Sequence, residues 1–331
     1  MKEDVHVVRP EGRTTSIRQR RIDVDLQKLS KKAPQILAGL TCMVTMMNEL
    51  YRLFRVCFPK YPASEDVFNE QLKPECARII FEYDKDRLVG YSLIHGNSIS
   101  LLCMDPNYRN RGIGSRLLKS SEELIRQTDA QTILLGRGKH YLLQGVPADE
   151  PLAQRFFEHR GYSADWVSVN MELYTDEWDR SALVLPSAPA RLGFRFADAH
   201  DRPALLTAVG DAHADWVRIF QTCNDPILLA TLDGRIVGFA ILNPNGGRFG
   251  DPAVQTGDVG CVGVIHSARN LGIGRQMVAH GIEWLKLQGC DTVELRYVAL
   301  VDWYERVGFR VKHRLWMGEK AISRKQDSTA R

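Results

Sequence analysis

Arg109-Asn110-Arg111-Gly112-Ile113-Gly114 and Arg269-Asn270-Leu271-Gly272-Ile273-Gly274 are two copies of one short motif in a chain of 331 residues. Each copy follows a short apolar run typical of a strand and opens an amphipathic run typical of a helix. Glycines at such a turn let a ligand approach the backbone, and the free N–H groups of the first helical turn point at an anion. The sequence therefore predicts a diphosphate-binding loop at each copy.

The surroundings of the two loops are repeated as well. Segments 87–94 and 235–242 both begin Arg-x-Val-Gly and precede the loops, whereas the Gly-aromatic pairs at 161–162 and 308–309 follow them. Three matched landmarks in the same order indicate an internal repeat.

Several other functions lack their sequence signatures. The third glycine of the dinucleotide fingerprint is replaced by Leu117 and Met277. No Gly-Lys-Ser/Thr follows either loop, which argues against a P-loop enzyme. There is no H-E-x-x-H motif and no zinc-type cysteine spacing, so no metal is expected.

The bulk composition suits an ordinary protein with two domains. A net charge of +4 is small for this length and does not argue for nucleic acid. The apolar run at 36–47 is too short to span a bilayer, so no membrane role is expected. Seven cysteines without a C-x-x-C pair favour reduced thiols and a cytoplasmic protein. Cys103 and Cys261, on the strands before the loops, are expected to pack in the core.

The repeated motifs resemble the GNAT superfamily of acyl-CoA-dependent N-acetyltransferases. That family has a strand ending V-x-P-x-x-[QR]-x-x-G-x-[GA] and a later helix ending Y-x-x-x-G-[FY]. The first copy supplies Met104-Asp105-Pro106 before its loop, whereas the second has His266 in place of the proline. The resemblance covers residues 36–174 and 193–315. It implies an α/β (α+β) fold of two tandem domains, each with a mixed, largely antiparallel sheet, flanking helices and splayed strands at the CoA site.

The repeat divides the chain into five expected parts. These are a charged arm (1–32), an N-terminal domain (33–175), a linker (176–192), a C-terminal domain (193–320) and a tail (321–331). Val167–Leu173 is expected to be the closing strand of the first domain. Extra residues are expected at 139–149 in the first copy and at 243–257 in the second.

The resemblance assigns acetyl-CoA as co-substrate and assigns residues to its binding. Backbone N–H groups on the strand before each loop would face pantetheine and the thioester, and the loop would hold the diphosphate. These residues are Leu102, Met104, Arg109, Asn110, Arg111, Gly112, Ile113 and Gly114 in the first copy, and Val262, Val264, Arg269, Asn270, Leu271, Gly272, Ile273 and Gly274 in the second.

The two copies differ in their potential for catalysis. Tyr304 occupies the family's general-acid position in the second copy, where the first has Phe157. Asp258 stands where several members carry a carboxylate base, and alternation along the strand would give it the same side as Val262 and Val264. An ordinary solvated loop aspartate is an equal alternative, and Glu294 on the next strand is the reserve candidate. These differences predict catalysis by the second copy.

The expected reaction is acetyl transfer to a primary amine by direct attack in a ternary complex. Among tandem members, segments 144–147 and 260–264 are more similar to glucosamine or glucosaminide N-acetyltransferases than to mycothiol synthase-like enzymes. A small amine such as an amino sugar is therefore the first expectation. A protein or peptide amine and a non-catalytic CoA-binding regulatory module are the alternatives. The sequence does not determine the oligomeric state.

Overall fold

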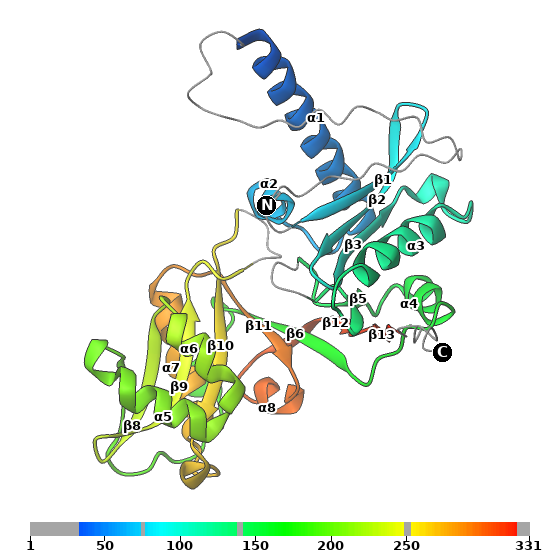
Figure 1. Ribbon diagram of the computed structural model, residues 1–331. Coiled ribbons are helices and arrows are strands. Elements are labelled where there is room, and N and C mark those ends of the chain that lie inside the picture. Colours follow the sequence, from blue (N-terminus) through cyan, green and yellow to red (C-terminus); the bar gives the residue numbers. More distant parts are fainter. Residues whose placement is uncertain (1–32, 74–76, 138–141, 248–252, 323–331) are drawn as a thin grey trace, which may run out of the picture. The chain divides into compact units, whose positions relative to one another are not determined.

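The computed structural model describes residues 33–73, 77–137, 142–247 and 253–322, which form two compact units (Figure 1). Among these described residues, unit 1 draws on the ranges 33–146, 152–165 and 317–322, and unit 2 draws on Pro147–Pro151 and Trp166–Trp316. The chain therefore passes more than once between units.

Unit 1 is built on a five-stranded sheet in the order β1-β2-β3-β4-β13. β1, β2 and β3 form an antiparallel meander, β4 lies parallel to β3, and β13 lies antiparallel to β4. Its strands are β1 (Arg78–Asp84), β2 (Arg87–His95), β3 (Ser98–Met104), β4 (Thr132–Leu135) and β13 (Glu319–Ala321). Its helices are α1 (Ala33–Cys57), α2 (Glu65–Asn69), η2 (Glu70–Leu72), η3 (Pro106–Tyr108), α3 (Ile113–Arg126) and α4 (Pro151–Glu158).

Unit 2 is built on an eight-stranded sheet in the order β5-β12-β6-β11-β10-β9-β8-β7. β10 and β11 are parallel, whereas β7 to β10 are joined by antiparallel pairs. Its strands are β5 (Val146–Pro147), β6 (Val167–Tyr174), β7 (Leu192–Phe196), β8 (Ile227–Leu232), β9 (Arg235–Asn243), β10 (Thr256–Val264), β11 (Thr292–Val298) and β12 (Arg310–Trp316). Its helices are η4 (Arg180–Ala182), η5 (Ala199–Asp201), α5 (Arg202–Ala212), η6 (Ala214–Trp216), α6 (Val217–Thr222), η7 (His266–Ala268), α7 (Ile273–Leu287) and α8 (Val301–Glu305).

Helices cover both faces of the unit 2 sheet because its strands alternate apolar residues on both sides. Leu228 of β8 joins the core that contains α7, whereas Leu229 joins the core that contains Val209 of α5 and Phe220 of α6. Adjacent strand residues project to opposite faces. The strands before the loop are therefore held from both sides.

β6 belongs to a different sheet from the one predicted. Its residues form a strand as expected, but they pair with β11 and β12 inside unit 2. β13, from the end of the chain, pairs instead with β4 of unit 1. The prediction that Val167–Leu173 closes the first domain is wrong, because an alternating pattern identifies a strand and not its pairing partner.

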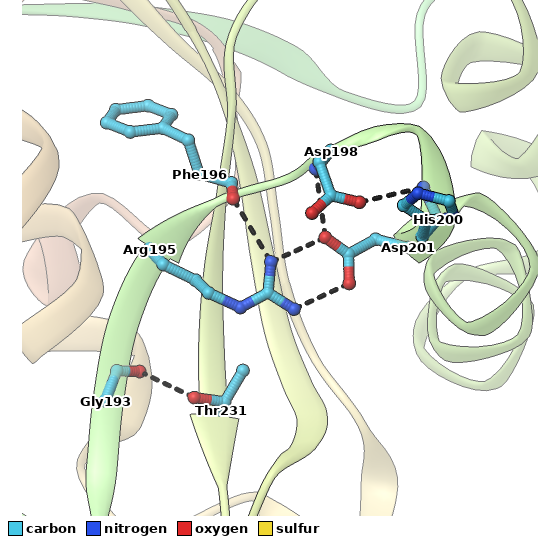
Figure 2. Close-up of polar contacts among 7 residues, drawn as sticks. All are labelled: Gly193, Arg195, Phe196, Asp198, His200, Asp201 and Thr231. Carbon is cyan, nitrogen blue, oxygen red and sulfur yellow. Dashed lines mark hydrogen bonds and ion pairs between the residues drawn. The ribbon is translucent and has the colours of Figure 1, made fainter.

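An ion pair fixes the junction between β7 and α5 (Figure 2). The Arg195 guanidinium donates to both carboxylate oxygens of Asp201, at 2.5 and 2.6 Å. These bonds lower the pKa of Asp201 to about 2. Asp201 also accepts the backbone N–H of Asp198 in a capping box. The pair therefore sets the start of α5, whose last turn reaches the loop of unit 2.

Candidate functional site

The two loops have the same backbone conformation. Gly112 precedes α3 with φ +78° and Gly272 precedes α7 with φ +77°, while Asn110 and Asn270 have φ +62° and +64°. Glycine and asparagine are the residues that accept such left-handed angles at least cost. The predicted strand-turn-helix loop is present at both copies, and diphosphate binding by it stays a prediction.

The loop of unit 2 is held by neighbouring elements. Arg269 donates to the carbonyl oxygens of Val264 and Ala212, at 3.3 and 3.2 Å. The backbone N–H of His266 donates to Asp211 at 2.7 Å, and this bond is the main cause of the lowered pKa of Asp211. Asp211 therefore serves to fix the loop.

The predicted linker contacts the unit 2 loop directly. Gln276 of α7 donates to the carbonyl oxygen of Pro186 at 2.7 Å. A Cβ placed on Gly272 would lie 2.4 Å from the Pro186 Cβ, whereas one on Gly112 would meet only an Arg116 nitrogen at 3.8 Å. The two glycines thus share a backbone conformation but differ in the space beside them.

We expect Gly272→Ala to impair acetyl transfer more than Gly112→Ala. Both changes place a Cβ at a left-handed φ, which costs about 1–2 kcal/mol, but only Gly272→Ala also forces the Pro186 ring to move. We expect kcat/KM for acetyl-CoA to fall at least about tenfold for Gly272→Ala and less than about threefold for Gly112→Ala. The opposite ranking would move catalysis to unit 1.

Two parallel strands separate beside each loop. β10 pairs with β11 only from Thr256 to Asp258, and β3 pairs with β4 only at Ser98 and Ile99. Beyond these pairs neither strand is in register with its parallel neighbour. The splayed strands implied by the family resemblance are therefore present in both units.

The strand before each loop contains a β-bulge, and the two bulges lie at slightly different positions. The register of β10 against β9 shifts between Gly260 and Gly263, and Cys261 has φ +47°. In unit 1, β3 also has a register shift against β2, at Ser100 between the paired residues Ile99 and Leu101, and β3 then pairs regularly from Leu101 to Met104. Because a bulge interrupts the ladder, it leaves an extra residue unpaired and redirects the strand. The bulge of β10 therefore lies closer along the strand to its loop than that of β3, and it places Cys261 at a positive φ.

The bulge also changes which residues of β10 lie on the same side of the sheet. Val259, Val262 and Val264 all pack on the core against α7. Asp258 precedes Val259 directly and so projects to the other face of the sheet. The prediction that Asp258 shares a side with Val262 and Val264 is wrong, because strict alternation does not continue through a bulge.

Tyr304 lies on α8 beside this bulge. The pKa of Tyr304 is raised to about 12, mainly by burial and to a smaller extent by the neighbouring Cys261. Its ring packs edge-on against Trp303 and Phe309, with centroids 4.7 and 6.0 Å away. Trp303 in turn contacts the second loop glycine, Gly274. The phenol is therefore protonated at neutral pH, lies near the bulge residue Cys261 and packs on Trp303, which contacts the loop.

Phe157, the residue of unit 1 that corresponds to Tyr304, is a core side chain. It is buried and packs edge-on against Tyr162, with ring centroids 5.5 Å apart. Phenylalanine cannot donate a proton, so this position supplies no general acid.

Asp258 is ion-paired with Arg296 of β11, and both side chains are mostly buried, at 13% and 18% exposure. The pKa of Cys261 is raised to about 11, mainly by burial and to a smaller extent by the charge of Asp258. Asp258 therefore lies near the bulge residue that also neighbours Tyr304. Gly246, at the start of the predicted insertion, packs directly on its Cβ; residues 248–252 of that insertion lie outside the described part.

Glu294 lies in a different ion cluster. Lys312 of β12 donates to Glu294 at 2.6 Å and lies 3.1 Å from Glu172 of β6. Burial alone would lower the pKa of Lys312, but the two carboxylates outweigh it and raise that pKa. Glu294 is thus held by a cation, which weakens its case as the reserve base.

Asp258, Glu294 and Arg296 share the face of the unit 2 sheet that is opposite the α7 core. Their strand neighbours Val259, Val293 and Leu295 all belong to that core. We call the part of this side formed by β6, β11 and the start of β10 the polar face of unit 2. β6 adds Ser168, Asn170 and Glu172 to it, between core residues Val169, Met171 and Leu173. Arg296 and Lys312 were not predicted, although the charges two residues apart at Glu294 and Arg296 were a signal for a polar side of this strand.

Within the described ranges, no group of three or more His, Cys, Asp or Glu side chains is arranged to hold a metal ion. Over the same ranges, none of the helices has both the length and the apolar character needed to cross a membrane.

Comparisons with known proteins agree with this geometry. Residues 44–162 and 195–309 match the Acetyltransferase (GNAT) family. A mycothiol acetyltransferase from Amycolatopsis mediterranei is 28% identical over 248 residues, which cover 67% of this chain and 77% of the relative.

Two solved structures share the fold. The glucosamine N-acetyltransferase region of a fungal β-N-acetylglucosaminidase has a TM-score of 0.69 and 21% identity, covering 82% of this chain and 36% of that one. A tandem GNAT protein from the clavulanic acid biosynthesis pathway has a TM-score of 0.63 and 14% identity, covering 85% and 96%. With both copies matched, the chain belongs to the GNAT acetyltransferase family and carries two tandem GNAT regions.

Proposed function

We propose that unit 2 transfers the acetyl group of acetyl-CoA to a primary amine of a small molecule, with an amino sugar as the first candidate. The observation that carries the assignment to unit 2 is the bulge at Gly260–Gly263 with Tyr304 beside it. In unit 1 the bulge of β3 lies at Ser100, and Phe157 stands in place of Tyr304. Family membership supports the chemistry, N-acetyl transfer from acetyl-CoA.

The residues present suit acetyl-CoA. The left-handed loop 269–274 exposes backbone at the start of α7, where an anion is favoured by the helix dipole. The separation of β10 from β11 after Asp258 leaves backbone groups near Val262 and Val264 for pantetheine and the thioester. When bound, acetyl-CoA supplies the activated acyl group.

The bulge and Tyr304 would stabilise different atoms of the thioester, namely its carbonyl oxygen and its leaving sulfur. The amine nitrogen forms a bond to the thioester carbon, and backbone N–H groups at the bulge stabilise the developing oxyanion. The C–S bond then breaks, and the Tyr304 hydroxyl donates its proton to the leaving thiolate. A pKa of about 12 keeps that proton available at neutral pH.

Asp258 is the proposed base that accepts the proton of the amine. A lysine-like ammonium at pH 7 is deprotonated only at a cost of roughly 4.6 kcal/mol, so a base accelerates the reaction. The Arg296 ion pair weakens Asp258 as a base and also holds it in position. Relay through a water molecule is compatible with this fixed carboxylate.

We expect Asp258→Asn to lower kcat about 10²-fold at pH 7, in line with typical general-base contributions. Above the pKa of the acceptor amine, the free amine is abundant and the loss should shrink. The measurement is a pH–rate profile for both proteins. A loss that stays constant from pH 6 to pH 10 would instead indicate that Asp258 acts through the position of Arg296 alone.

The relatives favour a small acceptor. Two relatives named mycothiol acetyltransferases match 67% and 71% of this chain, and the glucosamine N-acetyltransferase region shares its fold. Neither gives the acceptor of this chain. A protein or peptide amine is the second candidate, and a CoA-binding regulatory module the third.

The deciding experiment is release of free CoA thiol from acetyl-CoA across a panel of amines. The panel includes glucosamine, aminoglycosides, polyamines and lysine peptides, with CoA stoichiometry measured by calorimetry. Release with amino sugars supports the proposal, and release with lysine peptides alone would replace it. CoA binding without release on any amine would favour the regulatory module.

A further inference from the structure

β11 contains a second bulge, on the strand that diverges from β10. Leu295 pairs with Met171 and Val298 pairs with Val169, so Arg296 and Tyr297 together lie opposite one residue of β6, Asn170. Tyr297 has φ +58°, a conformation that costs a bulky residue about 1–2 kcal/mol. Such strain persists where the surrounding structure enforces it, and it is concentrated at ligand sites.

The bulge presents an aromatic surface to solvent. Tyr297 is 39% exposed and Trp166, just before β6, is 43% exposed. Their ring centroids are 6.4 Å apart and their planes meet at 34°. The faces of aromatic rings carry negative charge density, which attracts ammonium groups and polarised C–H bonds.

Polar atoms suited to hydroxyl groups lie next to this surface. Asn170 is 4% exposed, and among the described residues no group donates to its Oδ1. Ser168 is fully buried, and its Oγ has no hydrogen-bond partner within the described ranges. Leaving a buried acceptor unsatisfied costs about 1–3 kcal/mol. A ligand hydroxyl that reached Asn170 would remove that cost.

These residues belong to the face that carries the proposed base. The core residue Val169 lies between Ser168 and Asn170, which therefore point to the other side of β6. Trp166, two residues before Ser168, follows the same side. Arg296, within the bulge, is ion-paired with Asp258. The bulge of β11 therefore connects the aromatic surface to the carboxylate expected to accept the amine proton.

We propose that Trp166, Tyr297 and Asn170 form the acceptor subsite of unit 2, and that it takes a six-membered ring amine rich in hydroxyl groups. The aromatic pair contacts the C–H face of the ring, and Asn170 accepts a hydrogen bond from a ring hydroxyl. This inference rests on the proposed function of unit 2 and specifies its substrate class.

The test compares glucosamine with cyclohexylamine, which has the ring and the amine without hydroxyl groups. The variants are Trp166→Ala, Asn170→Ala and Tyr297→Asn. Asparagine is chosen for position 297 because it tolerates a left-handed φ. Leu287→Ala is an exposed control on α7. Each rate is divided by the wild-type rate for the same amine, which removes differences in amine pKa. Circular dichroism checks folding of every variant.

We expect Trp166→Ala, Asn170→Ala and Tyr297→Asn to lower kcat/KM for glucosamine at least about tenfold, and Asn170→Ala to change it less than about twofold for cyclohexylamine. Leu287→Ala should match wild type. Equal losses on both amines in all three variants, or no loss on glucosamine, would overturn the subsite.

Ligand-observed NMR separates failure of the subsite from failure of the proposed function. If the wild type turns over no amine yet binds glucosamine, and Trp166→Ala abolishes that binding, the catalytic proposal fails and the subsite holds. If the wild type does not bind glucosamine and does not acetylate it, the subsite is overturned even if lysine peptides are substrates.

Discussion

Replacing Tyr304 with phenylalanine should lower kcat at least about tenfold while leaving affinity for acetyl-CoA near that of the wild type. The ring fills its place beside Trp303 and Phe309 in either case, so packing is largely kept. Only the hydroxyl is lost, and with it the proton for the departing thiolate. The measurements are thiol release under saturating acetyl-CoA and CoA binding by calorimetry.

Tyr162→Phe in unit 1 is the matched control. Tyr162 is also buried, and its hydroxyl donates to Glu122 at 3.1 Å, so its loss tests the effect of removing a buried phenol away from the proposed site. We expect the control to change stability and leave kcat unaffected. Turnover that is unchanged in Tyr304→Phe would remove the acid role.

The pH dependence follows from the raised pKa of Tyr304. A value of about 12 means that the phenol keeps its proton from neutral pH to well above pH 10. Ionisation of Tyr304 should therefore cause no fall in wild-type rate below about pH 11. An alkaline limb near pH 9 would have to come from another group.

The loops could be predicted from the sequence because their physical requirements are local. Gly112 and Gly272 need left-handed angles, and the apolar residues of α3 and α7 recur at helical spacing. The helices predicted to follow the two loops are α3 (Ile113–Arg126) and α7 (Ile273–Leu287). Propensity, periodicity and turn chemistry all agree there.

The features that define the site depend on strand pairing, which the sequence does not encode locally. β6 could not be assigned to unit 2, because its alternating pattern fits either sheet. The bulges at Cys261 and Tyr297 place non-glycine residues at positive φ, which sequence rules do not anticipate. The charged positions of β11 were visible, but their partners Asp258 and Lys312 become apparent only when three strands are side by side.

Lys312→Met should destabilise the protein by about 3–5 kcal/mol, the usual cost of removing one partner from a buried ion pair. Lys312 lies between Glu294 and Glu172, and the Glu294 side chain is only 5% exposed. Methionine has similar length and no charge, so it leaves two carboxylates facing each other. Arg310, 3.5 Å from Glu172, compensates for part of the loss.

The sign of the pH dependence distinguishes loss of the Lys312 charge from simple loss of packing. In the wild type, the raised pKa of Lys312 means that its contribution is fully present below the ordinary lysine pKa and is lost as pH rises through the folded value. In Lys312→Met, the facing carboxylates should bind a proton more readily than in the unfolded chain. The destabilisation should therefore be largest at neutral pH and decrease towards pH 4.

Urea unfolding of wild type and variant at pH 7 and pH 5 measures both effects. Arg191→Ala is the control, because its pair with Asp233 is exposed at 81% and 60% and should contribute less than about 0.5 kcal/mol. The double variant Lys312→Met, Glu294→Gln should recover part of the lost stability, since one of the unpaired charges is gone. A cost below about 1 kcal/mol at pH 7, or no recovery in the double variant, would contradict a buried cluster that depends on Lys312.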